Sequence, residues 1–177
     1  LIDLLHKLGT RRDVLSLDTG RLPSETHEFF ETVRNHYDLP IELISPEPKG
    51  VGTLVKTKGL FSFYQDGHQE CCDVRKVQPL HEKLATLNAW VTGQRQDQSV
   101  TRSSIPPRQL DDMFSTTTNA LTKFNPLAEW TSMEVWHYIR ANQVPYNSLH
   151  DQGFLSLGCQ PCTRAILSLI HISEPTR

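Results

Sequence analysis

The chain has 177 residues, of which 37% are hydrophobic and 21% are charged, with a formal net charge of −2. This length fits one domain with a real core, and the near-neutral charge gives no general attraction to nucleic acid or to an anionic membrane. No apolar run approaches the roughly 20 residues that cross a bilayer, and the first residues are not typical of a signal peptide. Four cysteines are too few for a disulfide scaffold, so we expect a cytoplasmic protein with reduced thiols.

The first half of the chain alternates short apolar runs with segments that carry helix signals. Gly9 is placed to end a first helix and Pro23 to begin a second. The apolar run 14–17 predicts a buried strand that ends in the turn composition Asp18-Thr19-Gly20. Three glycines and three lysines within residues 49–59 predict a mobile loop. The predicted elements are helix 1–8, strand 14–17, helix 23–37, strand 41–44, helical turns over 71–77 and 79–86, and strand 89–92.

The second half is less regular until a well-marked helix. Residues 94–112 are polar and predict an irregular segment. Thr131 and Glu134 form a capping box for a helix that ends at Asn142. The alternation of strands and helices predicts an α/β fold, with a mostly parallel sheet flanked by helices. In such folds ligands bind beyond the carboxyl ends of the strands, where residues 18–20 and 93–95 lie.

The cysteines form two pairs, the adjacent Cys71 and Cys72 and the two-spaced Cys159 and Cys162. Adjacent side chains diverge, and thus fit two corners of an iron–sulfur cluster, while the two-spaced pair fits the other two. Zinc sites are usually built from two two-spaced pairs, which an adjacent pair matches poorly. A disulfide between neighbours is strained and rare. The spacing favours a cluster, with a zinc site and plain thiols as the alternatives.

Several cations lie near these motifs along the chain. Lys76 follows Cys72 by four residues, hence on the same helix face, and Lys76 or Arg75 would balance an anionic metal–thiolate centre. Arg95 and Arg102 flank the loop after the third predicted strand. The planar guanidinium of arginine binds sulfate and phosphate in bidentate fashion, so these two residues are candidates for binding such a group. The ordinary alternative for each is a solvated or purely structural charge.

Taken in chain order, the motifs resemble those of the assimilatory adenylyl-sulfate reductases, relatives of the phosphoadenylyl-sulfate reductases. The resembling stretches are Ser16-Leu17-Asp18-Thr19-Gly20-Arg21-Leu22, Cys71-Cys72-Asp73-Val74-Arg75-Lys76-Val77, Ala89-Trp90-Val91-Thr92-Gly93-Gln94-Arg95, Asn125-Pro126-Leu127-Ala128-Glu129-Trp130-Thr131 and Gly158-Cys159-Gln160-Pro161-Cys162-Thr163-Arg164. The resemblance implies a fold of the adenine nucleotide alpha hydrolase type. It also implies cytoplasmic reduction of adenylyl sulfate to sulfite and AMP, with thioredoxin or a similar thiol as the reductant.

The resemblance also implies site roles. The four cysteines, Cys71, Cys72, Cys159 and Cys162, would hold a 4Fe-4S cluster beside the sulfate of the substrate. The residues expected to bind substrate are Asp18, Thr19, Gly20, Lys76, Arg95 and Arg102. Among them, Lys76 would bridge cluster and substrate, Arg102 would contact the phosphosulfate, and residues 18–20 would lie at the nucleotide.

The sequence departs from the family pattern at both ends. A Ser-Gly-Gly-like phosphate loop and a carboxy-terminal segment with the nucleophilic cysteine are expected and not found. We therefore expect residues 1–167 to be a fragment of the reductase domain without turnover, and 168–177 to be a non-native tail. The alternatives are a phosphoadenylyl-sulfate reductase, the small subunit of a sulfate adenylyltransferase, and a non-catalytic metal–thiolate domain. A homo-oligomer is left open.

Overall fold

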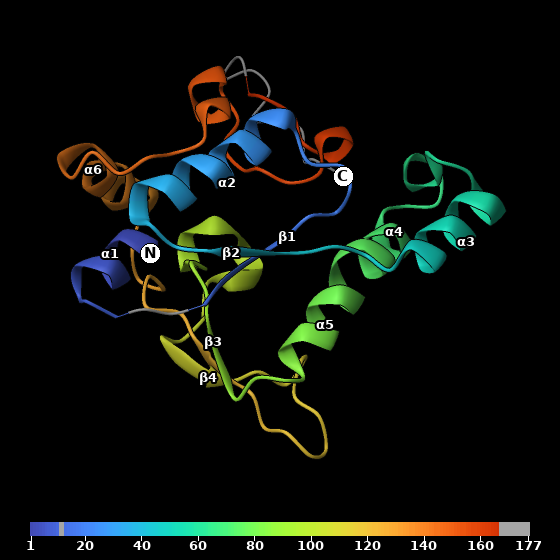
Figure 1. Cartoon of the computed structure of the whole chain (residues 1–177), viewed down its shortest axis with the longest axis horizontal. Helices are drawn as coiled ribbons and strands as arrows, with labels where there is room; N and C mark the ends of the chain where they lie inside the picture. Colours follow the sequence, from blue (N-terminus) through green and yellow to red (C-terminus); the bar gives the residue numbers. More distant parts are fainter. Residues whose placement is uncertain (11–12, 167–177) are drawn as a thin grey trace.

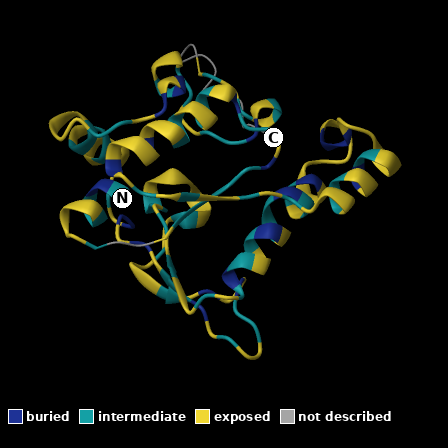
Figure 2. Cartoon of the chain, viewed as in Figure 1, coloured by how far each residue is buried: buried dark blue, intermediate teal, exposed yellow. Residues whose placement is uncertain are grey.

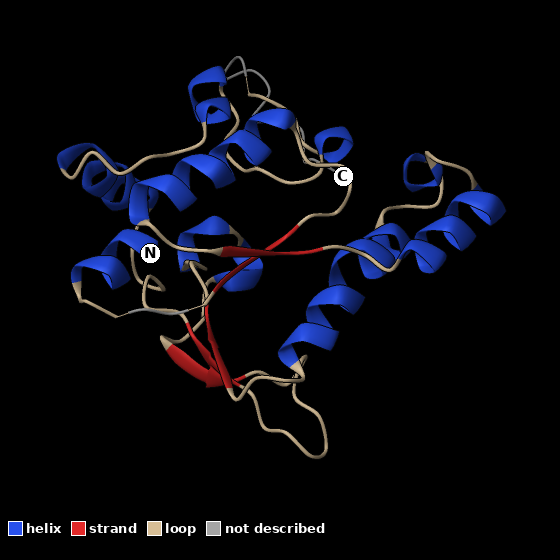
Figure 3. Cartoon of the chain, viewed as in Figure 1, coloured by secondary structure: helices blue, strands red, loops and turns tan. Residues whose placement is uncertain are grey.

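The computed structural model describes residues 1–10 and 13–166. These residues form five strands and six α-helices (Figures 1 and 3). They are α1 (Ile2–Lys7), β1 (Val14–Leu17), α2 (Ser24–Tyr37), β2 (Ile41–Ile44), α3 (Pro48–Lys58), α4 (Gln69–Cys72), α5 (Gln78–Leu84), β3 (Ala89–Val91), β4 (Arg108–Leu110), β5 (Thr122–Phe124) and α6 (Ser132–Ala141). Helices and strands alternate up to α3; α3, α4 and α5 then follow one another before β3, β4, β5 and finally α6. The predicted helices and strands before residue 45 are confirmed to within a residue or two.

The strands form two small sheets within the described residues. β1 pairs with β2 in parallel, with Val14 opposite Ile41. The second sheet has the order β3-β5-β4, in which β3 and β5 are parallel and β4 is antiparallel to β5. The predicted mostly parallel α/β class is confirmed. The prediction of an irregular segment over 94–112 is wrong at its end, because β4 pairs with β5 there.

The predicted mobile loop over 49–59 is wrong, since this stretch is the helix α3. Glu47 caps it by accepting a hydrogen bond from the Gly50 N–H at 3.0 Å, and Pro48 occupies its first turn. Leu54 is buried against Phe63 and Cys71. Capping and burial therefore outweigh the low helix propensity of the glycines.

A single bent helix carries the adjacent cysteines. α4 ends at Cys72, and Asp73–Val77 continue as a π-helix in which the Gln78 N–H donates to the Asp73 carbonyl. Pro79 lies in the first turn of α5 and cannot donate a hydrogen bond to the carbonyl one turn back, so the wider turn accommodates its ring. The two predicted helical turns are thus one continuous helix that ends at Leu84.

Buried residues lie along this bent helix, whereas α3 is exposed over most of its length (Figure 2). One apolar cluster joins Leu54, Phe63 and Cys71. A second joins Leu84, Phe114 and Leu121, and Trp90 of β3 packs against it. Cys71 therefore belongs to the core of the molecule as well as to the cysteine pair.

Three helices, α1, α2 and α6, meet at one buried carboxylate. Asp3 of α1 is 7% exposed and accepts hydrogen bonds from the hydroxyls of Tyr37 in α2 and Tyr138 in α6. The predicted capping box at the start of α6 is confirmed, with the Thr131 N–H donating to Glu134 at 2.7 Å. None of the helices described for this chain combines the length and apolar character needed to cross a bilayer.

Candidate functional site

The carboxyl end of β1 forms a tight turn. The Gly20 N–H donates to Asp18 Oδ1 at 2.9 Å, and Gly20 has a φ of +69°, in the left-handed region that favours glycine. The Asp18 N–H bonds the Ile44 carbonyl at 2.9 Å, which fixes the turn against the end of β2. Thr19 is 2% exposed. The turn thus presents fixed backbone groups at the strand end, where the sequence predicted nucleotide binding.

The second cysteine pair lies directly beside this turn. Thr19 Oγ1 is 3.1 Å from Cys159 Sγ, and the Gln160 N–H donates to the Arg21 carbonyl at 2.8 Å. The Cys162 N–H donates to the Cys159 carbonyl at 2.9 Å and closes the Cys-Gln-Pro-Cys turn. In Figure 1 this turn, drawn in red, lies next to the segment that follows β1.

Arg21 and Tyr64 join the first cysteine pair to the second. The Arg21 guanidinium donates to Cys71 Sγ at 3.9 Å, lies 4.6 Å from the Phe63 ring centroid, and also bonds the Leu60 carbonyl at 2.5 Å. The Tyr64 hydroxyl donates to the Pro161 carbonyl at 3.0 Å. The segment before Cys71 is therefore attached to the turn that carries Cys159 and Cys162.

The electrostatics of Cys162 report on the same neighbourhood. All four cysteines are free thiols; Cys71 and Cys159 are buried, and Cys162 is exposed. Although Cys162 is exposed as a residue, partial desolvation of its thiol raises its pKa. The charge of Cys159, and then those of Cys72 and Cys71, raise this pKa further, whereas the charge of Lys76 lowers it.

The four cysteines, carried by two segments of the chain, are free thiols and so supply the donor atoms of a metal–thiolate centre. Within the described residues, no group of three or more His, Cys, Asp or Glu side chains is arranged to hold a metal ion. That the four thiols together bind one cluster therefore stays a prediction.

The two candidate arginines of the loop after β3 differ in their hydrogen-bond partners. Arg95 donates to Asp97 at 2.9 Å and to Ser132 Oγ at 2.9 Å, so its side chain ties this loop to the start of α6. Arg102 is half-buried and donates to the neutral Gln98 Oε1 at 2.7 Å. Arg95 therefore shapes the loop, and Arg102 keeps a charge that no described carboxylate pairs with.

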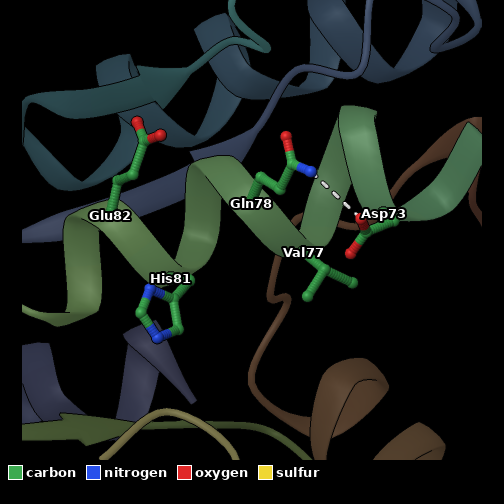
Figure 4. A pocket seen from close by; sticks show the side chains of 5 residues that line it. All are labelled: Asp73, Val77, Gln78, His81 and Glu82. Carbon is green, nitrogen blue, oxygen red and sulfur yellow. Dashed lines mark hydrogen bonds between the residues drawn. The ribbon is translucent and has the colours of Figure 1, made fainter. Parts of the chain in front are cut away.

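A surface pocket of about 270 Å³ lies along the π-helix and α5 (Figure 4). It is lined by Asp73, Val77, Gln78, His81 and Glu82. Gln78 and Asp73 are hydrogen-bonded to each other at 3.0 Å. Two carboxylates make this pocket unsuited to an anionic ligand, and none of its lining residues belongs to the predicted substrate set.

Arg21 and Tyr64 were not among the residues for which the sequence predicted a role. Arg21 follows the strand-end turn directly, and that position was the one available signal. Tyr64 offered none, because its partner carbonyl is 97 residues away.

Comparisons with known proteins place these features in a family. A sequence model of the phosphoadenosine phosphosulfate reductase domain matches residues 1–165. The adenosine 5'-phosphosulfate reductase of Pseudomonas aeruginosa (strain LESB58) is 53% identical over 175 residues, which cover 98% of this chain and 66% of that protein. The chloroplastic 5'-adenylylsulfate reductase 3 of Arabidopsis thaliana is 49% identical over 178 residues, covering 98% of this chain and 39% of that protein. The chain thus spans just under two thirds of the bacterial relative and well under half of the plant one.

The fold comparison agrees with the sequence comparison. The crystal structure of phosphoadenylyl-sulfate reductase from Candida auris in complex with phosphate matches with a TM-score of 0.68 and 26% identity. The match covers 92% of this chain and 76% of that chain. The predicted tail, residues 168–177, lies outside the described residues.

Proposed function

Because the chain belongs to the phosphoadenosine phosphosulfate reductase domain family, we propose that it forms part of a thioredoxin-dependent adenylyl-sulfate reductase of sulfate assimilation. The observation that carries the proposal is the approach of both cysteine-bearing segments to the carboxyl end of β1. In α/β proteins of this kind the ligand binds at that edge. The proposed location is the cytoplasm, where thiols stay reduced.

Adenylyl sulfate is the proposed substrate. The turn Asp18-Thr19-Gly20 would receive the nucleotide, and the Lys76 ammonium and the Arg102 guanidinium would face the phosphosulfate. Both bacterial and plant relatives are named for adenylyl sulfate. Arg95 would act by holding the loop after β3 in place through its bonds to Asp97 and Ser132.

A 4Fe-4S cluster on Cys71, Cys72, Cys159 and Cys162 is the proposed cofactor. When bound, it would supply a fixed electrostatic centre beside the sulfate rather than a carrier of electrons. Arg21 donates to Cys71 Sγ and would offset part of the thiolate charge.

The proposed reaction of the whole enzyme begins with the thiolate of a further cysteine, which is not one of the four in this chain. This thiolate attacks the sulfate sulfur. The bond from sulfur to the bridging oxygen breaks, its electron pair leaves with AMP, and an S-sulfocysteine remains. A dithiol of the thioredoxin class then releases sulfite and is itself oxidised to a disulfide. Lys76 and Arg102 would stabilise the charge on the transferring group and on the departing phosphate. Since the proposed cluster uses all four thiols, we propose that the 177-residue chain has no turnover by itself.

The experiment is anaerobic expression with iron, acid-labile sulfide and zinc measured on the purified chain. The proposal expects a brown protein with about four irons per chain, and loss of iron in Cys72→Ser and Cys162→Ser. Arg34→Met, which removes an exposed cation of α2 paired with Glu31, serves as the matched control and keeps its iron. A colourless protein with one zinc would instead support a non-catalytic metal–thiolate domain.

Substrate class and turnover are measured on the same preparation. Calorimetry should show adenylyl sulfate binding more tightly than 3'-phosphoadenylyl sulfate; the reverse order would support a phosphoadenylyl-sulfate reductase. Sulfite release by the 177-residue chain with thioredoxin would overturn the proposal that this chain has no turnover.

A further inference from the structure

Arg75 lies in the π-helix directly after the adjacent cysteines and is 5% exposed. Its Nη1 donates to the Thr19 carbonyl at 2.7 Å. We propose that Arg75 is a positioning residue that couples the metal-binding cysteines to the nucleotide-binding turn, so that metal and nucleotide bind cooperatively. This inference rests on the proposed function, because it takes residues 18–20 as the nucleotide site.

The burial of Arg75 is not explained by local stability alone. Its Nε is the one buried side-chain nitrogen or oxygen without a hydrogen-bond partner in residues 1–10 and 13–166. A buried guanidinium with an unmade hydrogen bond costs free energy compared with an apolar residue of similar size. Retaining an arginine here is therefore consistent with a task other than packing.

Thr19 is held from both cysteine segments at once. Its carbonyl accepts from Arg75, which is carried by the helix of Cys71 and Cys72. Its hydroxyl lies 3.1 Å from Cys159 Sγ. Thr19 is 2% exposed, so it has little freedom to satisfy these groups in another way. Ordering either cysteine segment thus orders the same residue of the turn.

Gly20 leaves the space that this arrangement needs. A Cβ on Gly20 would lie 3.4 Å from Arg75 Nη1, and its φ of +69° already disfavours any side chain. The guanidinium therefore packs against the backbone of the turn. Arg75 reaches the turn through this contact and through the carbonyl bond.

Cooperativity follows from the shared ordering. Metal ligation would fix both partners of Thr19, and a nucleotide that binds afterwards would no longer bear the entropy cost of ordering the turn. Linkage requires the converse, so that nucleotide would tighten the metal site by the same factor. The contact is made by a fork that bonds a carbonyl while lying on the backbone, a geometry that lysine does not reproduce.

The test measures AMP affinity by calorimetry for the iron-loaded and the metal-free chain. We expect wild type to bind AMP about tenfold more tightly when loaded, and Arg75→Lys to reduce this ratio to about twofold or less. Arg34→Lys is the matched control, because Arg34 is an exposed residue of α2 that pairs with Glu31. Its ratio should remain that of wild type.

Hydrogen–deuterium exchange supplies a readout that does not depend on affinity. In wild type, iron loading should slow exchange of the Gly20 and Arg21 amides, and in Arg75→Lys it should not. Protection within α2 should be equal in both proteins, which shows that the variant is folded. Equal affinity ratios together with equal protection in wild type and Arg75→Lys would overturn the coupling. If wild type binds AMP in neither form, the proposed nucleotide site fails, and the exchange data alone decide the role of Arg75.

Discussion

Thr19 Oγ1 lies 3.1 Å from Cys159 Sγ, although the two residues are 140 positions apart. Both are buried. The contact brings the end of β1 and the Cys-Gln-Pro-Cys turn into one site. It also makes Thr19 the side chain through which the second cysteine pair touches the strand-end turn.

Replacing Thr19 by valine should test this contact with little change of shape. The variant leaves the Cys159 thiol without its partner, and we expect a loss of about 1 kcal/mol in the free energy of unfolding of the metal-free protein. Thr19→Ser keeps the hydroxyl and should lose less. Urea denaturation of both variants measures the difference; a Thr19→Val chain as stable as wild type would show that the contact contributes nothing.

The four thiols should differ in their rates of alkylation. Cys162 is exposed, Cys72 is half-buried, and Cys71 and Cys159 are 9% and 6% exposed. The raised pKa of Cys162 lowers its thiolate fraction, but access limits the two buried thiols more strongly. In the metal-free protein we therefore expect iodoacetamide to modify Cys162 before Cys71 and Cys159. Peptide mass spectrometry over time gives the order. Equal rates at all four sites in folded protein would contradict the described packing.

Arg21 should be required for assembly of the cysteine site. Arg21→Met keeps much of the aliphatic length but removes the bonds to the Leu60 carbonyl and Cys71 Sγ and the contact with Phe63. We expect a loss of about 2 kcal/mol and reduced iron content after anaerobic reconstitution. Arg34→Met is the control on an exposed helix face. Wild-type iron content in Arg21→Met would show that Arg21 is not required for assembly of the cysteine site.

The capping box of α6 makes an independent stability prediction. Thr131 accepts from the Glu134 N–H, and Glu134 accepts from the Thr131 N–H and hydroxyl. Thr131→Ala should cost about 1 kcal/mol, whereas Thr131→Ser should cost less because it retains the oxygen. Chemical denaturation measures both, and AMP affinity should be unchanged in either variant.

Alkaline pH should destabilise the fold through Tyr37. Burial, followed by the nearby Asp3 carboxylate, raises the pKa of Tyr37 to about 12. A raised pKa in the folded state means that the stabilisation is complete below the unfolded pKa near 10 and is lost as pH rises toward 12. Stability of wild type should therefore fall over this window. Tyr37→Phe removes the titrating hydroxyl and should show a shallower fall by urea denaturation at pH 9, 10 and 11; parallel curves would contradict this assignment.

Local signals in the sequence were sufficient for several elements. The apolar runs of β1 and β2, the Pro23 helix start and the Thr131 capping box each depend on residues within a few positions of one another. Such signals are physical properties of short segments, so they survive in the fold. Composition failed at α3, because the burial of Leu54 against Phe63 outweighed the two glycines within the helix. β4 escaped prediction because three residues gain strand structure only by pairing with β5.

The sequence by itself predicts which cysteines are candidate metal ligands, since the two cysteine pairs and the residues around them suffice for that prediction. It does not predict the contacts that surround these cysteines in the fold. The Arg21 bond to Cys71, the Tyr64 bond to Pro161 and the Arg75 bond to Thr19 join positions that are 50 or more residues apart. Nothing local encodes such contacts, because they arise only when helices and strands pack. The chain itself thus determined which chemical groups are present, and tertiary packing alone decided which of them meet.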